Sequence, residues 1–400
     1  MKALRKYLDK IKPNFQEGGK FSKLKSTFGA FESFFFVPDK VTTKGAHIRD
    51  NMDMKRNMTA VIIALLPALF FGMWNTGSFH YKALGENPGF WSEFFYGLGQ
   101  VFPIIVVSYV SGLFLEFLFA QIRKEEVNEG FLVTGLLIPM IVPVDVPLWM
   151  VAVATMFAVL IGKEVFGGTG MNIVNPALLA RAFLFFAYPS KMSGDKVWIA
   201  GMGDPETKIV DGFSGATPLA DLANTGSTHY SIADQFFGFI PGAIGETSTL
   251  CILIGAVILI WTGVASWKIM ISGVAGLLLT GLLINAVGSS YDISSLKDAS
   301  EIARVNYLNT PFWQHLILGG FAFGIVFMAT DPVTAAQTET GKWIYGFLIG
   351  AMVLLVRVIN PAFPEGVMLA ILFGNICAPL IDHIIIRQNI KRRLKRAKTN

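Results

Sequence analysis

The residues best suited to chemistry form a short motif near the middle of the chain, with the spacing Asp-x-x-Ser-Gly-Ala-Thr: Asp211, Ser214, Gly215, Ala216 and Thr217. The threonine hydroxyl can form a phosphate ester, and the small residues before it leave space for a modifying enzyme. The pattern predicts that a separate flavin transferase joins the phosphate of FMN to an exposed Thr217 hydroxyl. The alternative is an ordinary turn rich in serine and glycine, which is common in loops.

A second group of candidates lies in the glycine-rich stretch 162–177, which contains Lys163, Asn172 and Asn175. A phosphate-binding Walker loop needs its lysine after the glycines, whereas Lys163 precedes most of them, so nucleotide hydrolysis is unsupported. Glycines and asparagines predict instead a helix break in which backbone and amide groups contact a flat, neutral, hydrogen-bonding ligand. A tight turn that serves helix packing is the alternative.

Acidic residues in or beside apolar runs form the third group. Glu116 lies in the run Leu-Phe-Leu-Glu-Phe-Leu, where an ionised carboxylate costs several kcal/mol unless it meets water, a cation or a partner. Such carboxylates suit a transient alkali cation or a proton; the alternative for Glu116 is a satisfied structural acid. Asp331 could instead cap a helix that begins at Pro332. Asp382 lies near the end of the last apolar segment, and Glu32, among phenylalanines, is an entry residue or a solvated edge residue.

The composition places these residues in a membrane protein. Hydrophobic residues make up 53% of the 400 residues and charged residues only 15%, against roughly 25% charged residues in soluble domains. Neither the spacing of the two cysteines nor the five scattered histidines indicates a disulfide or a metal site. The net charge of +5 is concentrated at the two ends of the chain, which favours a role in membrane topology over binding to nucleic acid.

Ten apolar segments follow a basic N-terminal segment. They are centred near residues 58–74, 96–120, 131–143, 148–162, 171–188, 248–264, 267–288, 312–329, 343–358 and 366–386. Several are shorter than the roughly 20 residues that a spanning helix needs, and Pro139, Pro143 and Pro176 interrupt two of them. Interrupted helices persist at membrane depth only where protein buries them or where they line a cavity. We therefore expect an all-α polytopic membrane protein with ten transmembrane helices, some of them broken.

Charge and a weak repeat predict how these helices are arranged. Most of the 33 lysines and arginines lie in the N-terminal segment, in the tail and in loops on the same side, which places both termini in the cytoplasm and 189–247 outside. Asn-Pro-Ala occurs at 175–177 and again at 360–362, which indicates two inverted repeats of five helices. Two helix-initiating Asn-Pro turns can also match by chance.

The expected organisation has five parts. They are a cytoplasmic or interfacial basic segment at 1–57, a first membrane repeat at 58–188, an outer loop with the flavinylation motif at 189–247, a second membrane repeat at 248–386 and a basic cytoplasmic tail at 387–400.

The chain resembles the B subunit of the bacterial sodium-translocating NADH:quinone reductases. The stretches that carry the resemblance are 16–19, 162–177, 181–189, 193–195, 214–217, 360–362 and 364–366. The D subunit of the Rnf ferredoxin:NAD complex is a related alternative, because it shares the flavinylation motif. The long basic N-terminal segment and the basic tail favour the reductase, since the Rnf relative lacks such an extension.

The resemblance implies a bacterial inner-membrane complex of six subunits that passes electrons from NADH to ubiquinone and exports sodium. It implies covalent FMN on Thr217, within the motif that contains Ser214 and Gly215, and a noncovalent riboflavin near Asn172 and Asn175. The partners would be the other subunits, the flavin transferase, membrane lipid, ubiquinone and sodium.

The family's quinone region corresponds by spacing to Gly112 and Glu116, although the family's Gly-Gly pair reads Ser-Gly here. Acids at four positions are linked in the family to sodium uptake: Glu32, Glu116, Asp331 and Asp382. Two other functions stay open. Inverted repeats and buried acids also suit a non-redox secondary transporter. A membrane anchor for soluble redox subunits would need no cofactor. Covalent flavin on Thr217 separates both from the reductase.

Overall fold

The computed structural model describes most of the chain. The described residues are 2–16, 18–21, 25, 27–29, 32, 36, 42–46, 54–124, 127, 130–203, 209–210, 212–291, 296, 298–359 and 365–399. Asp211 of the flavinylation motif and the second Asn-Pro-Ala sequence at 360–362 lie outside them. Every regular element within these ranges is a helix.

Six of the described helices are long and apolar enough to cross a membrane, the third of them together with the short turn η3 (Glu164–Phe166). They are α3 (Met54–Leu84), α4 (Phe90–Arg123), α6 (Leu148–Gly162), α12 (Trp267–Gly288), α15 (Glu339–Ile359) and α16 (Val367–Thr399). Three shorter apolar helices are α5 (Phe131–Ile141), α7 (Pro176–Ala187) and α11 (Thr249–Trp261). The expectation of an all-α membrane protein is confirmed, whereas the count of ten spanning helices stays a prediction.

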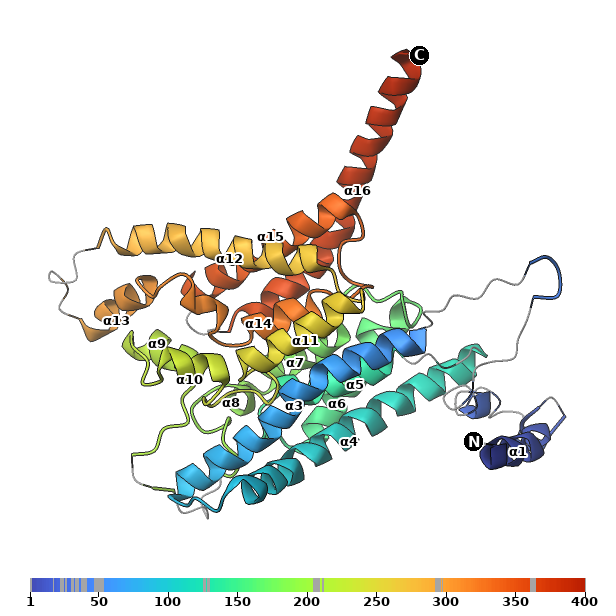
Figure 1. Ribbon diagram of the computed structural model, residues 1–400, viewed down its shortest axis with the longest axis horizontal. Helices are drawn as coiled ribbons and strands as arrows, with labels where there is room; N and C mark the ends of the chain where they lie inside the picture. The colour runs from blue at the N-terminus through green and yellow to red at the C-terminus, as the bar shows by residue number, and fades with distance from the viewer. Residues whose placement is uncertain are drawn as a thin grey trace.

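The remaining helical elements are short. They are α1 (Lys2–Ile11), η1 (Lys12–Phe15), α8 (Pro189–Met192), α9 (Pro218–Thr225), α10 (Ile232–Phe237), α13 (Ala299–Leu308), η5 (Gln314–Leu316), α14 (Phe321–Phe323) and the π-helix η6 (Gly324–Met328). Helices α9 and α13 pack together at one end of the bundle, at the left of Figure 1, while the C-terminal part of α16 extends beyond the other helices. The eighth predicted segment, 312–329, is therefore divided into the short helical elements η5, α14 and η6.

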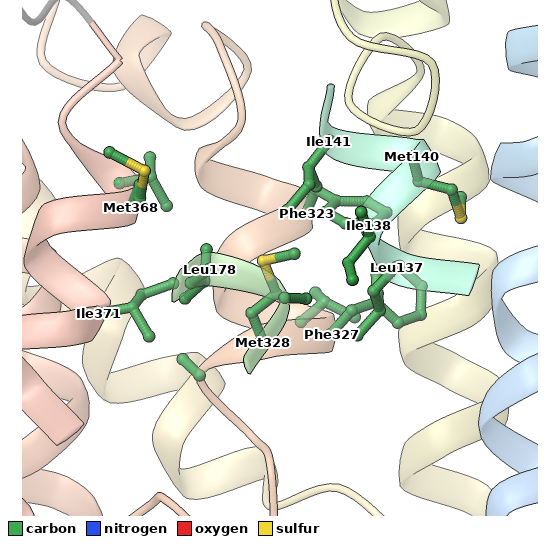
Figure 2. Packing of buried hydrophobic residues seen from close by; sticks show 14 of the residues in the cluster. Leu137, Ile138, Met140, Ile141, Leu178, Phe323, Phe327, Met328, Met368 and Ile371 are labelled. Atoms are coloured by element: carbon green, nitrogen blue, oxygen red, sulfur yellow. The ribbon is translucent and has the colours of Figure 1, made fainter. Parts of the chain in front are cut away.

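The short helices form the centre of the hydrophobic core. Figure 2 shows side chains from α5, α7, the α14–η6 segment and α16 gathered together, and ten are labelled: Leu137, Ile138, Met140, Ile141, Leu178, Phe323, Phe327, Met328, Met368 and Ile371. All of them are buried. Backbone groups at the ends of helices cannot be left unpaired in hydrocarbon, so a broken helix is tolerated here because other helices surround it.

Glycines let the long helices approach closely. A Cβ atom on Gly97 of α4 would overlap the carbonyl of Met73 on α3, and one on Gly77 would overlap the carbonyl of Glu93. The second half has the same feature, since a Cβ on Gly350 of α15 would overlap the carbonyl of Gly273 on α12. Small residues at such contacts allow close backbone packing, which drives helix association in membranes.

We expect Gly97→Ala to destabilise the bundle by about 1–3 kcal/mol, because the new methyl group must push α3 and α4 apart. Gly99→Ala is the matched control, since nothing lies within 4 Å of a Cβ built at Gly99 of the same helix. Alanine there should be neutral or stabilise by up to about 1 kcal/mol. Thermal unfolding of both purified variants in detergent checks this, and equal melting temperatures would contradict the close helix contact.

Candidate functional site

Thr217 begins the short helix α9. It is the N-cap residue, and its Oγ1 accepts a hydrogen bond from the backbone N–H of Ala220 at 3.2 Å. Pro218 follows at the first helical position, where the missing N–H has no helical partner to lose. Thr217 is therefore oriented by its helix, and its hydroxyl keeps its proton and a second lone pair, so the capping bond does not prevent esterification.

The surroundings of Thr217 differ from the expected open loop. Thr217 is half-buried, and Gly215 and Ala216 are buried. A Cβ on Gly215 would overlap the carbonyl of Asp195 and come within 2.9 Å of the Met202 sulfur. Gly215 thus lets the motif pack against the 195–202 loop, while the clearance that it gives to the Thr217 hydroxyl stays a prediction. Ser214 is exposed and closes a local turn, because its Oγ accepts from Ala216 N–H at 3.2 Å.

A pocket lies beside Thr217. Its cavity volume is about 50 Å³, less than the roughly 300–1,000 Å³ of small-molecule sites, and about 570 Å³ of empty space is counted only when the open solvent at its mouth is included. The residues that line it are Phe185, Met192, Ser193, Gly194, Trp198, Thr217, Leu219, Ala220, Glu365, Gly366, Met368 and Leu369. The lining combines two aromatic rings, apolar side chains and one acid, so it offers apolar and polar contacts to a flat ring held at the pocket mouth.

A buried ion-pair network reaches this pocket from the core. Arg181 of α7 donates to Glu246 Oε1 at 2.6 Å and also to Glu365, the acid in the pocket lining. Arg357 of α15 donates to the carbonyls of His315 (3.0 Å), Leu318 (2.8 Å) and Glu365 (3.1 Å). The side chain of Arg181 is 5% exposed. Two cations and two acids therefore balance one another next to Thr217.

This network was not predicted from the sequence. Arg181 lies between alanines and phenylalanines, and Arg357 lies in the run Leu-Leu-Val-Arg-Val-Ile. Either cation inside an apolar run is a sign of a buried acidic partner. The identity of that partner was not readable, because Glu246 is 65 residues away from Arg181 and Glu365 is 184 residues away.

Glu246, which lies in the segment before α11, has an altered protonation equilibrium. Burial raises the pKa of its carboxyl group to about 7, Arg181 opposes the rise and the neighbouring Glu365 adds to it. The carboxyl group therefore gains or loses a proton near neutral pH.

A second pair of buried charges lies near the C-terminal end of α4. Glu116 accepts a hydrogen bond from the ammonium group of Lys163, and both side chains are at most 6% exposed. The next residue after Lys163, Glu164, pairs with Arg123 at 3.0 Å. Glu116 therefore has the partner that a satisfied structural acid requires, while its role toward sodium or quinone stays a prediction.

Gly112 lies one helical turn before Glu116. A Cβ at this position would overlap the ring of Phe131, which is 1% exposed. The glycine thus lets α5 begin directly against α4, and Ser111, which stands in the place of the family's first glycine, donates to the Val107 carbonyl at 2.7 Å. A role of Gly112 in quinone binding stays a prediction.

The two asparagines of the glycine-rich stretch have different surroundings. Asn175 is buried and is the N-cap of α7, where its Oδ1 accepts from the N–H groups of Ala177 (2.9 Å) and Leu178 (3.4 Å). Asn172 is half-buried and makes only a long contact of 3.5 Å to the Val174 carbonyl. The glycine-rich turn lies against the Arg123–Glu164 ion pair, since a Cβ on Gly168 would come within 3.0 Å of Arg123.

Asp331 lies in the loop between η6 and α15, and Asp382 binds the end of that loop from α16. Asp331 accepts from the Thr334 hydroxyl at 2.9 Å and from Val333 N–H at 3.3 Å, in a turn rather than at the start of a helix. The alternative that Asp331 caps a helix is therefore wrong. Asp382 of α16 accepts from Thr338 N–H at 2.9 Å and from Gln337 N–H at 2.7 Å.

The fourth acid, Glu32, lies in the N-terminal segment. It pairs with Lys12 at 2.8 Å and with Arg5 at 3.5 Å, and its side chain is 16% exposed. The side chain of Thr27 accepts from Gln121 of α4 at 2.6 Å, which links this segment to the helix of Glu116. Among the described residues, no three His, Cys, Asp or Glu side chains are arranged to hold a metal ion. The four acids thus lie in separate local networks.

Comparison with known proteins agrees with this picture. Residues 41–391 match the model of the NQR2, RnfD, RnfE family, and the chain belongs to that family. It is 46% identical to the B subunit of the Na(+)-translocating NADH-quinone reductase of Stutzerimonas stutzeri, over 98% of this chain and 99% of the relative. Proteins of the same name from Ectopseudomonas mendocina and Pseudomonas aeruginosa are 47% and 44% identical over similar lengths. The resemblance drawn from the sequence motifs is confirmed.

Variants of the Glu116–Lys163 pair can distinguish a structural role of Glu116 from a functional one. Glu116→Leu leaves a buried ammonium group without its partner and should cost about 3–5 kcal/mol, whereas Glu116→Leu with Lys163→Met removes both charges and should recover most of that loss. Glu339→Gln is a control with little expected effect, because that acid is 65% exposed.

Thermal unfolding in detergent measures the stabilities of these variants, and sodium-dependent turnover measures their function. A double variant that is stable but has lost sodium dependence would assign Glu116 more than a structural role. A double variant as unstable as the single one would contradict the pairing.

Proposed function

We propose that this chain is the membrane subunit of a sodium-pumping NADH:quinone oxidoreductase and carries covalent FMN on Thr217. Full-length identities of 44–47% to proteins named as the B subunit of that enzyme support the first part. They favour the reductase over the related Rnf complex. The observation that supports the second part most directly is the pocket that Thr217 itself lines.

The residues around Thr217 fit a flavin. Phe185 and Trp198 offer aromatic faces for a planar ring, and Gly194 and Gly366 bring the backbone close to the pocket. A phosphate ester on Thr217 would tether the ring at the edge of this pocket and restrict its search to a small volume, which raises its local concentration. A bound flavin supplies reversible electron transfer, and this chain's residues would position it and exclude water.

The proposed topology places the flavin outside and both termini inside the bacterial inner membrane. Basic residues at the two ends of the chain support this orientation. The division into five parts at residues 57, 188, 247 and 386 follows from it. Ubiquinone, sodium, membrane lipid, further subunits and a separate flavin transferase are the partners that this function requires.

Two inverted five-helix repeats remain our interpretation of the bundle. Helix contacts support it, since α4 packs on α6 as α12 packs on α15, and α6 packs on α7 as α15 packs on α16. The first and last helices of the two halves also meet across the middle, as α3 with α11 and α7 with α16. Related contacts of this kind are what internal duplication produces in transporter folds.

The remaining sites are carried by the family resemblance. Asn172 and Asn175 would hold riboflavin at the cytoplasmic end, because amide groups pair with the polar edge of a neutral ring. Gly112 and Glu116 would border the quinone region. Glu32, Glu116, Asp331 and Asp382 would contribute to the sodium pathway, and their oxygen atoms are the ligands that an alkali cation prefers.

We expect Thr217→Ala to abolish covalent flavin while the helical bundle still assembles, because only the cap of the eight-residue helix α9 is lost. Thr225→Ala is the matched control, since Thr225 is an exposed threonine of the same helix. Ultraviolet fluorescence of the denatured chain on a gel and the mass of the Thr217 peptide measure the attachment. Flavin retained by Thr217→Ala would overturn the assignment, and its absence from the wild-type chain would favour the transporter or the anchor.

Asn175 needs a substitution that spares the helix cap. Asn175→Ser should retain the α7 N-cap, since serine caps helices about as well as asparagine, while it removes the amide group. Together with Asn172→Ala it should release noncovalent riboflavin and leave the covalent FMN in place. Acid-extractable flavin measures the first and gel fluorescence the second, and an unchanged riboflavin content would place the site elsewhere.

A further inference from the structure

The acid in the pocket lining is an unusual feature for an apolar ring site. Glu365 is the charged residue among the lining residues, and its side chain is 29% exposed. Its carboxylate pairs with Arg181, which is itself buried and also pairs with Glu246. Glu365 therefore both lines the pocket and neutralises a buried cation.

We propose that Glu365, oriented by the positioning residue Arg181, fixes the charge at the wall of the pocket beside Thr217 and thereby sets the reduction potential of the flavin bound there. This inference rests on the proposed attachment of FMN to Thr217. No proton or electron passes through Glu365 in this proposal. Its carboxylate acts only through its electrostatic field.

The direction of the effect follows from the sign of the charge. An electron added to a ring next to a carboxylate is destabilised by repulsion, so Glu365 lowers the reduction potential. Replacing the carboxylate by a neutral group removes the repulsion and leaves Arg181 with one partner fewer. A unit charge about 10 Å away changes the equilibrium constant for adding one electron on the order of tenfold at an effective dielectric of about 20, which corresponds to about 59 mV.

The remainder of the network gives the effect a pH dependence. Glu246 faces Arg181 on α7, Glu365 before α16 and Arg357 on α15. Because its pKa lies at about 7, Glu246 is mostly neutral below that pH and mostly anionic above it. Neutral Glu246 resembles glutamine. At pH values above 7, Glu246→Gln should therefore raise the reduction potential of the flavin. At pH values below 7, the same substitution should change this potential less and less.

The experiment compares the reduction potentials of the covalent flavin in variants of the intact complex. Subtracting the redox titration of the Thr217→Ala complex from that of each variant isolates the signal of the Thr217 flavin. Glu365→Gln should raise this potential by about 59 mV per electron, and Glu365→Asp, which keeps the charge, should leave it near the wild-type value. Glu164→Gln is the matched control, because Glu164 is a buried acid paired with an arginine at the other end of the bundle.

The outcomes separate the two proposals. Gel fluorescence first establishes whether flavin is attached, and an unlabelled wild-type chain would overturn the proposed function together with this inference. Attached flavin with the same potential in wild type, Glu365→Gln and Glu246→Gln at pH 8 would overturn the role of Glu365 alone. If Glu365→Gln does not assemble, Glu246→Gln tests the same field, and an equal shift at pH 6 and pH 8 would contradict the network.

Discussion

The need to neutralise charge inside an apolar bundle constrains this structure more than any other interaction. An unpaired buried cation costs several kcal/mol, and Arg181 and Arg357 are both at most 5% exposed. Arg181 can be buried only because Glu246 and Glu365 reach it from distant parts of the chain. Removing Arg181 would leave both acids without this cation, so α7 and the segments before α11 and α16 are held together through it.

That arrangement explains why the short helices can lie at the centre. Helix α7 has its first N–H groups capped by Asn175 and its middle fixed by the arginine network, so neither its start nor its side chains need water. Side chains of α5, α7 and the α14–η6 segment then fill the core between the long helices. Backbone that would be costly next to lipid is stable here because protein surrounds it.

Local features could be predicted from the sequence, whereas long-range pairs could not. The apolar segments and the Thr217 motif are patterns within a few residues of one another, and the all-α membrane class followed from them. Glu116 was singled out for its apolar surroundings, but its partner Lys163 is 47 residues away, and the pairing of the two could not be predicted. Gly215 was chosen for the clearance that it gives to Thr217, whereas its packing against the Asp195 carbonyl depends on the fold and could not be predicted.

One segment of the chain, from Lys163 to Arg181, connects the ion pair of Glu116 with the network beside Thr217. Lys163, which holds Glu116, is followed by the glycine-rich turn, Asn175 and then Arg181 on α7. An electrostatic change at the pocket beside Thr217 would therefore act on α7. The start of α7, capped by Asn175, follows the turn that contacts the Arg123–Glu164 ion pair. Coupling between sites needs an element that both sites bias between two arrangements. Helix α7 is the element that connects the two sites, because Asn175 caps its start and Arg181 in its middle pairs with Glu246 and Glu365.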